Sequence, residues 1–138
     1  MECKILVTSV GSSPGIDIVK SLKKDPSIMV TGSDSFIWGL KIGEQLCHNV
    51  LQLPHSKSES EKFCEHLSQL SKEYDFVFFG TDDDVLAFSS CDSFMDCPHH
   101  LPNNQINTIL LDKYKTFQYS KRKDLFPETF LHFNTENF

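Results

Sequence analysis

The sequence predicts an α/β protein: a doubly wound, mostly parallel sheet with helices on both faces, a Rossmann-like fold. Short apolar segments rich in β-branched residues alternate along the chain with segments whose apolar residues recur at helical spacing. One short segment, Phe76-Val77-Phe78-Phe79, has no polar position, as is typical of a strand that helices cover on both faces. Strands and helices in this alternation form parallel sheets through right-handed crossovers.

The first two strands are expected at residues 4–10 and 28–34, because each is an apolar run too short for a helix of its own. Between them, a turn over residues 11–15 leads into a helix. Pro14 suits its first turn, where the missing N–H would be unpaired in any residue. The helix ends at Asp25-Pro26, since proline cannot continue it.

A short helix over residues 36–46 and a short third strand within residues 47–54 come next. The most clearly defined helix follows Ser58-Glu59-Ser60-Glu61, a capping box in which the hydroxyl and the carboxylate each satisfy a free backbone N–H. Behind this box, apolar residues recur at spacings that place them on one helix face. They are Phe63, Leu67, Leu70 and Tyr74.

The last third of the chain continues the pattern less regularly. A helix is expected to begin within residues 81–84, directly after the fourth strand. From Asn103 we expect a short strand or turn, then a helix through residues 113–117 and a further strand from residue 128.

Length and charge limit the function classes. The chain has 138 residues, room for one core, so we expect one domain. With 13 basic and 19 acidic residues the formal charge is −6, which argues against a nucleic-acid or anionic-membrane surface. No apolar run approaches the roughly 20 residues of a membrane span, and the N-terminus lacks a secretion signal, so we expect a cytoplasmic protein.

The chain has five cysteines and no Cys-x-x-Cys pair, so five reduced thiols are expected in this compartment. The group Cys91, Cys97, His99 and His100 matches no common zinc spacing, and we expect no metal there. Near the end, apolar rings crowd the sequence and would pack on another domain or form a homo-oligomer contact. These rings are Phe126, Phe130, Phe133 and Phe138.

In open parallel sheets, ligands bind beyond the carboxyl ends of the strands. The loop after the first strand offers Gly11, Ser12 and Ser13 at a helix N-terminus, where an anion or carboxylate could bind. The dinucleotide fingerprint G-x-G-x-x-G is broken, because Ser9 stands at its first glycine, but Asp34 follows where a ribose-binding acid is expected. The alternative is a tight turn in which glycine serves close packing.

The loop after the fourth strand carries Thr81, Asp82, Asp83 and Asp84. Its carboxylates could hold Mg²⁺ or accept hydrogen bonds from a substrate ammonium group. The simpler interpretation is that Thr81 or Asp82 caps a helix and the other acids face its dipole, which we favour for Asp84. Thr81 and Asp82 remain candidate site residues.

Taken together and in order, several short motifs resemble ATP-grasp enzymes, specifically the N-terminal domain that precedes the ATP-grasp fold in relatives of the carbamoyl-phosphate synthase large subunit. The motifs are Lys4-Ile5-Leu6-Val7-Thr8, Gly11, Pro14-Gly15, Gly32-Ser33-Asp34, Leu51-Gln52-Leu53-Pro54, Phe79-Gly80-Thr81-Asp82-Asp83, Leu111-Asp112-Lys113-Tyr114-Lys115-Thr116 and Pro127-Glu128-Thr129. The resemblance covers essentially the whole chain.

This resemblance implies an ATP-dependent carboxylate–amine ligase that uses Mg-ATP and forms an acyl phosphate. The acid substrate would lie against Gly11, Ser12 and Ser13 and against the loop of Thr81 and Asp82, and Lys113 would reach the nucleotide. The second nucleotide lysine, the flap and the metal ligands of such enzymes would follow residue 129, and the sequence ends before them. The resemblance therefore implies that the N-terminal domain covers residues 1–126 and that residues 127–138 start the connection to a missing C-terminal ATP-grasp domain, the expected partner. It also implies no catalytic residue here and no tight ATP binding by this chain alone.

Two other interpretations stay open. A stand-alone Rossmann-like module would hold a nucleotide, dinucleotide or nucleotide-sugar through residues 11–15 and Asp34. A phosphate-accepting response receiver fits poorly, because its paired acids should follow the first strand, where this chain has Ser9 to Ser13.

Overall fold

In the computed structural model, residues 2–91, 98–102 and 104–125 are described. They belong to two compact units, Met1–Leu101 and Pro102–Phe138. The domain boundary expected after residue 126 and the phenylalanines from Phe126 onward lie outside the described residues, so these expectations stay predictions.

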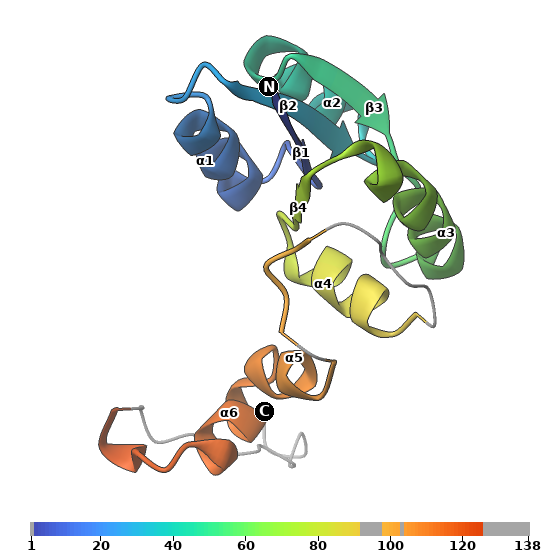
Figure 1. Ribbon diagram of the computed structural model, residues 1–138. Coiled ribbons are helices and arrows are strands. Elements are labelled where there is room, and N and C mark those ends of the chain that lie inside the picture. The colour runs from blue at the N-terminus through green and yellow to red at the C-terminus, as the bar shows by residue number, and fades with distance from the viewer. Residues whose placement is uncertain (1, 92–97, 103, 126–138) are drawn as a thin grey trace, which may run out of the picture. The chain divides into compact units, whose positions relative to one another are not determined.

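The first unit contains a sheet of parallel strands in the order β3-β2-β1-β4, with helices packed beside it (Figure 1). The strands are β1 (Cys3–Val7), β2 (Ile28–Asp34), β3 (Asn49–Gln52) and β4 (Phe76–Phe78). The helices are α1 (Ser13–Leu22), α2 (Ile37–Leu46), α3 (Ser60–Leu70) and α4 (Asp82–Ser89), with a short 3-10 turn at Ser71–Glu73. The expected Rossmann-like α/β fold is confirmed.

Alternate side chains of the central strand β1 serve two separate cores. Ile5 and Val7 pack with Val19 of α1 on one face of the sheet. Leu6, between them, joins the cluster on the other face, which α3 and α4 cover. Because both faces are buried, the central strands carry continuous apolar runs, as the sequence indicated.

The strand order reverses beside β1. The chain moves outward from β1 through β2 to β3, then returns to place β4 on the opposite side of β1. The loops that leave β1 and β4 therefore diverge at a topological switch point, the place where open parallel sheets bind ligands.

The capping box expected at Ser58-Glu59-Ser60-Glu61 is wrong. Helix α3 begins at Ser60, and its N-cap residue Glu59 makes no side-chain capping bond. The backbone N–H groups of Lys57 and Ser58 instead donate to the Nδ1 atom of His55, at 3.2 and 3.3 Å. This preceding turn uses the Ser58 N–H and delays the start of the helix.

The expectation of five reduced thiols is also wrong, because Cys64 of α3 forms a disulfide with Cys91, which follows α4. Cys3 and Cys47 are free, and Cys97 lies outside the described residues. The two bonded thiols are 27 residues apart in sequence and meet only because α3 packs against α4.

The second unit contains α5 (Asn104–Leu110), α6 (Lys113–Tyr119) and a 3-10 turn at Lys123–Leu125. The strand or turn expected from Asn103 is wrong, since α5 follows there. Its residues Ile106, Ile109 and Leu110 are spaced as on a helix, and the short run is ambiguous in sequence. Asp112 caps α6 by accepting hydrogen bonds from the N–H groups of Tyr114 and Lys115. No described helix is long and apolar enough to cross a membrane.

Candidate functional site

A cleft of about 310 Å³ lies at the carboxyl edge of the sheet, where the loops after β1, β2 and β4 meet. We call it the switch-point cleft. Its volume is at the lower end of the range of small-molecule sites. The lining residues are Ser9, Gly11, Ser12, Asp34, Ser35, Phe36, Trp38, Gly39, Ile42, His55, Ser56, Thr81 and Asp83.

Ser9 has the left-handed backbone conformation that glycine usually provides, with φ at 46°. This is the position at which the dinucleotide fingerprint has its first glycine. A non-glycine residue pays about 1 kcal/mol or more for this conformation. The Ser9 hydroxyl offsets part of that cost by donating to Asp84 Oδ2 at 2.7 Å.

Asp84 is a buried carboxylate, 2% exposed, that joins α4 to the end of β1. Its Oδ2 atom accepts hydrogen bonds from the hydroxyls of Thr8 (2.6 Å) and Ser9. The Thr8 hydroxyl in turn accepts the backbone N–H of Gly80. The sequence indicated only an interaction with the helix dipole for Asp84, because nothing local shows that α4 packs beside β1.

Backbone donors of the glycine-rich loop are used within the chain. Ser12 caps α1 by accepting the N–H of Gly15 at 3.0 Å, and its hydroxyl also donates to the carbonyl of Gly80. The N–H of Gly11 donates to Asp34 Oδ2 at 3.0 Å, and the N–H of Ser12 donates to the Ser9 carbonyl. Pro14 has no N–H to offer. Most N–H groups of this loop therefore bond acceptors within the chain and are not free for a ligand.

Asp34, the last residue of β2, is 8% exposed and held from two directions. Its Oδ2 accepts from Gly11, and its Oδ1 accepts the N–H of Phe36 at 3.0 Å. A carboxylate has about four lone-pair sites, so each oxygen keeps acceptor capacity. Gly39 of α2 lies directly against this carboxylate, because a side chain built at Gly39 would overlap it.

The α2 side of the cleft exposes large apolar side chains. Trp38, the single tryptophan of the chain, is 72% exposed and Phe36 is 60% exposed. The Phe36 ring meets the ring of His55 edge-on, at 5.1 Å between centroids. The ammonium group of Lys41 lies 5.1 Å from the Trp38 ring. Exposed aromatic groups at the rim of a polar cleft are typical of ligand contact.

His55 has a defined tautomer. Because its Nδ1 accepts two backbone N–H groups, the neutral ring carries its proton on Nε2. The same ring lines the switch-point cleft and an adjoining hollow of about 360 Å³. The hollow shares Ser35, Phe36 and His55 with the cleft. Its other lining residues are Gln52, Leu53, Pro54, Glu59 and His66.

Of the residues that the sequence singled out, Gly11, Ser12 and Thr81 line the cleft, whereas Ser13 and Asp82 are not among its lining residues. Lys113 begins α6 in the second unit, and its nucleotide role stays untested. The sequence patterns did not mark the apolar run of Phe36 to Trp38, the buried Ser56 or His55 as site residues. The one local signal was three large apolar residues directly after the acid-terminated second strand.

The carboxylates after β4 do not converge on a cation. Asp84 turns into the protein, while Asp82 and Asp83 are exposed. Within the described ranges, no group of three histidine, cysteine, aspartate or glutamate side chains could hold a metal ion.

No protein-family model and no curated protein sequence matches the chain. Among solved structures, a UDP-glucuronic acid 4-epimerase from Bacillus cereus, bound to UDP-glucuronic acid and NAD, matches with 20% identity and a TM-score of 0.40, covering 70% of this chain and 39% of its own. WbmH from Bordetella bronchiseptica, bound to NAD⁺, has 15% identity and a TM-score of 0.41 over 84% of this chain and 36% of its own. An ADP-L-glycero-D-manno-heptose-6-epimerase from Helicobacter pylori has 13% identity and a TM-score of 0.41 over 83% and 36%. This chain thus spans well under half the length of each.

The resemblance to ATP-grasp ligases is wrong: the similar structures described above are two epimerases and WbmH, not ligases of that family. The cofactor, substrate and partner that the resemblance implied are therefore wrong as well. They were Mg-ATP, a carboxylate and a missing ATP-grasp domain. The motifs misled because they have local structural tasks. Thr81 and Asp112 cap helices, and Asp34 binds the turn at Gly11. Parallel sheets of many functions need such residues at strand ends.

Proposed function

We propose that the unit Met1–Leu101 binds a small molecule that contains a nucleoside, whether free or as part of a nucleotide or dinucleotide, in the switch-point cleft. The observation that supports this most strongly is the meeting of three strand-end loops around one cleft with a polar floor and an aromatic rim. Such a cleft matches a ligand that has a planar ring at one end and hydroxyl groups at the other.

Each part of a nucleoside has a counterpart among the lining residues. The free acceptor capacity of Asp34 suits sugar hydroxyl groups, which donate well to a buried carboxylate. The exposed ring of Trp38 and the Phe36 ring offer faces and edges on which a base can stack. The Nε2–H group of His55 offers one donor between the cleft and the adjoining hollow.

Trp38 makes the test direct, because the only tryptophan of the chain borders the cleft. Titration of the full chain with adenosine should change the tryptophan fluorescence saturably, and the same ligand should raise the unfolding temperature. Ser56→Ala should weaken binding, because Ser56 lines the cleft, and the exposed Glu61→Gln of α3 is the control. If adenosine, AMP and NAD all leave fluorescence and unfolding temperature unchanged at millimolar concentration, the proposal is wrong.

A further inference from the structure

We infer that the switch-point cleft selects against phosphate at the end of the ligand that faces α4 and prefers a neutral or cationic nucleoside. This inference rests on the proposed function and narrows it to a ligand class. It comes from the charges, the backbone donors and the aromatic groups around the cleft.

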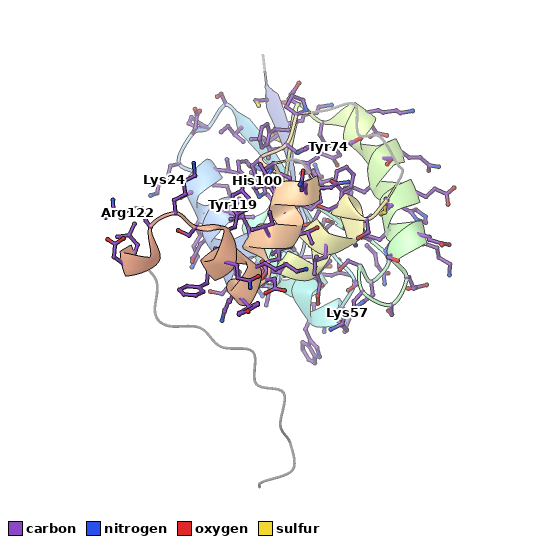
Figure 2. The ribbon with its side chains drawn as sticks, turned by 90° about the horizontal axis from the view of Figure 1, so that it is seen from below. Lys24, Lys57, Tyr74, His100, Tyr119 and Arg122 are labelled. Atoms are coloured by element: carbon purple, nitrogen blue, oxygen red, sulfur yellow. A yellow bond between two sulfur atoms is a disulfide. The ribbon has the colours of Figure 1, made fainter. Side chains whose placement is uncertain are left out.

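The charges of the cleft are of one sign. Asp34 and Asp83 line it, and none of its described lining residues is a lysine or arginine. The adjoining hollow adds Glu59. Lys57, in the loop before α3, has an exposed side chain (Figure 2). It is not among the lining residues of either space. A cleft lined by carboxylates and by no lysine or arginine repels an anion and attracts a cation. The ammonium group of Lys41, beside the Trp38 ring, belongs to α2 and not to the end that faces α4.

Three N–H groups of the loop after β1 are not available to offset these carboxylates. Phosphate sites at strand–helix turns bind through free N–H groups of the loop. Here the N–H groups of Gly11, Ser12 and Gly15 donate to Asp34 Oδ2, the Ser9 carbonyl and the Ser12 hydroxyl. The Asp34 carboxylate therefore already occupies an anion-binding position of this loop.

Two features point to the ligand that is accepted. Ser56 is 7% exposed and lines the cleft, and its hydroxyl makes no hydrogen bond to any described residue. This hydroxyl is free to bond a neutral polar group of a ligand. The Trp38 ring already attracts the ammonium group of Lys41, as it would attract a cationic group of a ligand.

The inference is tested with three ligands that differ only at the 5′ position: adenosine, 5′-amino-5′-deoxyadenosine and AMP. Tryptophan fluorescence of the full chain at low ionic strength should give an AMP dissociation constant at least about tenfold above that of adenosine. The amino compound should bind at least as tightly as adenosine. Added salt should narrow the difference between AMP and adenosine, because screening weakens the repulsion.

Variants then locate the repulsion. Asp83→Asn should improve AMP binding about threefold relative to adenosine, whereas Glu61→Gln, an exposed first-turn acid of α3, should leave this ratio unchanged. If adenosine binds and AMP binds equally or more tightly, or if Asp83→Asn leaves the ratio unchanged, the inference is wrong and the proposed function stands. If none of the three ligands binds, the proposed function itself fails and the inference fails with it.

Discussion

The loop after β1 and the start of α2 border the same cleft, but they are built in opposite ways. In the first, Ser9 and Ser12 direct their hydroxyls to Asp84 and to the Gly80 carbonyl, inside the protein. In the second, Phe36 and Trp38 are mostly exposed, and the α2 N-cap makes no side-chain bond. The loop after β1, although it looks like a binding motif, therefore serves the fold, whereas the aromatic start of α2, which no motif marks, keeps its side chains exposed to a ligand.

The largest effect is expected for the loop after β1, whose hydroxyl groups bond inside the protein. Asp84→Ala leaves the buried hydroxyl of Thr8 and the half-buried hydroxyl of Ser9 without the Asp84 acceptor, so the free energy of unfolding should fall by about 2–4 kcal/mol. Asp82→Ala, in the same helical turn but exposed, should cost about 0.3–1 kcal/mol through the helix dipole. Urea denaturation measures both. Equal losses would show that Asp84 does not join α4 to β1.

Gly39→Ala tests the contact between α2 and the Asp34 carboxylate, which binds the loop after β1. The new methyl group would overlap the Asp34 carboxylate, so Asp34 must move away from the N–H groups of Gly11 and Phe36. We expect nucleoside binding to weaken at least about tenfold and the unfolding free energy to fall by about 1–3 kcal/mol. Glu44→Ala, at an exposed position of the same helix, should change neither. Unchanged nucleoside binding in Gly39→Ala would contradict a role for Asp34.

At the start of α2, Trp38→Ala should weaken ligand binding without changing the stability of the fold. Because the ring is 72% exposed, the unfolding free energy should stay within about 0.5 kcal/mol of wild type. Loss of a stacking surface should weaken nucleoside binding by about 1–3 kcal/mol, measured by calorimetry since the fluorescent reporter is gone. A large loss of stability with unchanged binding would show that Trp38 stabilises the fold, and the start of α2 would then not differ from the loop after β1.

Ser9→Gly tests the backbone strain at Ser9, in the loop after β1. Glycine adopts a φ of 46° freely, which relieves about 1 kcal/mol of strain, but the hydrogen bond to Asp84 is lost. These effects oppose each other, so the net change in unfolding free energy should be below about 1 kcal/mol. Ser9→Ala keeps the strain and loses the bond, and it should be less stable than Ser9→Gly. The opposite order, seen in thermal unfolding, would contradict this account.

The smallest effect concerns pH. His99 lies beside Val77 of β4, and partial burial lowers the pKa of its imidazole below the ordinary value of 6.5. The unfolded chain then binds a proton more readily than the folded one, so His99 contributes its full stability above about pH 6.5 and loses it as pH falls through the lower folded pKa. Thermal unfolding from pH 8 to 5 should show a shallower fall for His99→Asn than for wild type. Identical profiles would contradict the shift.

The sequence predicts those parts of the fold that follow from local periodicity. The strands at Ile28–Asp34 and Phe76–Phe78 follow from apolar runs, and the helix cap at Thr81 follows from a side chain that bonds its own turn. These patterns act over a few residues, so tertiary contacts seldom override them.

The remaining features depend on residues far apart in sequence. The bonds from Thr8 and Ser9 to Asp84 span more than 70 residues, and no local pattern reveals them. The His55 ring takes the N–H of Ser58, which the capping box was expected to use. The same limit applies to the candidate site: Gly11 and Thr81 could be placed at the sheet edge, whereas Ser56 and Trp38 enter the cleft only through packing.

The most direct test of the account is an amide chemical-shift map of the isotope-labelled full chain during adenosine titration. We predict saturable shifts concentrated at residues 34–39 and 55–56, which border the cleft, with little change at the exposed residues of α3. Shifts that cluster away from these two segments, or their absence at saturating millimolar adenosine, would contradict the proposed binding site.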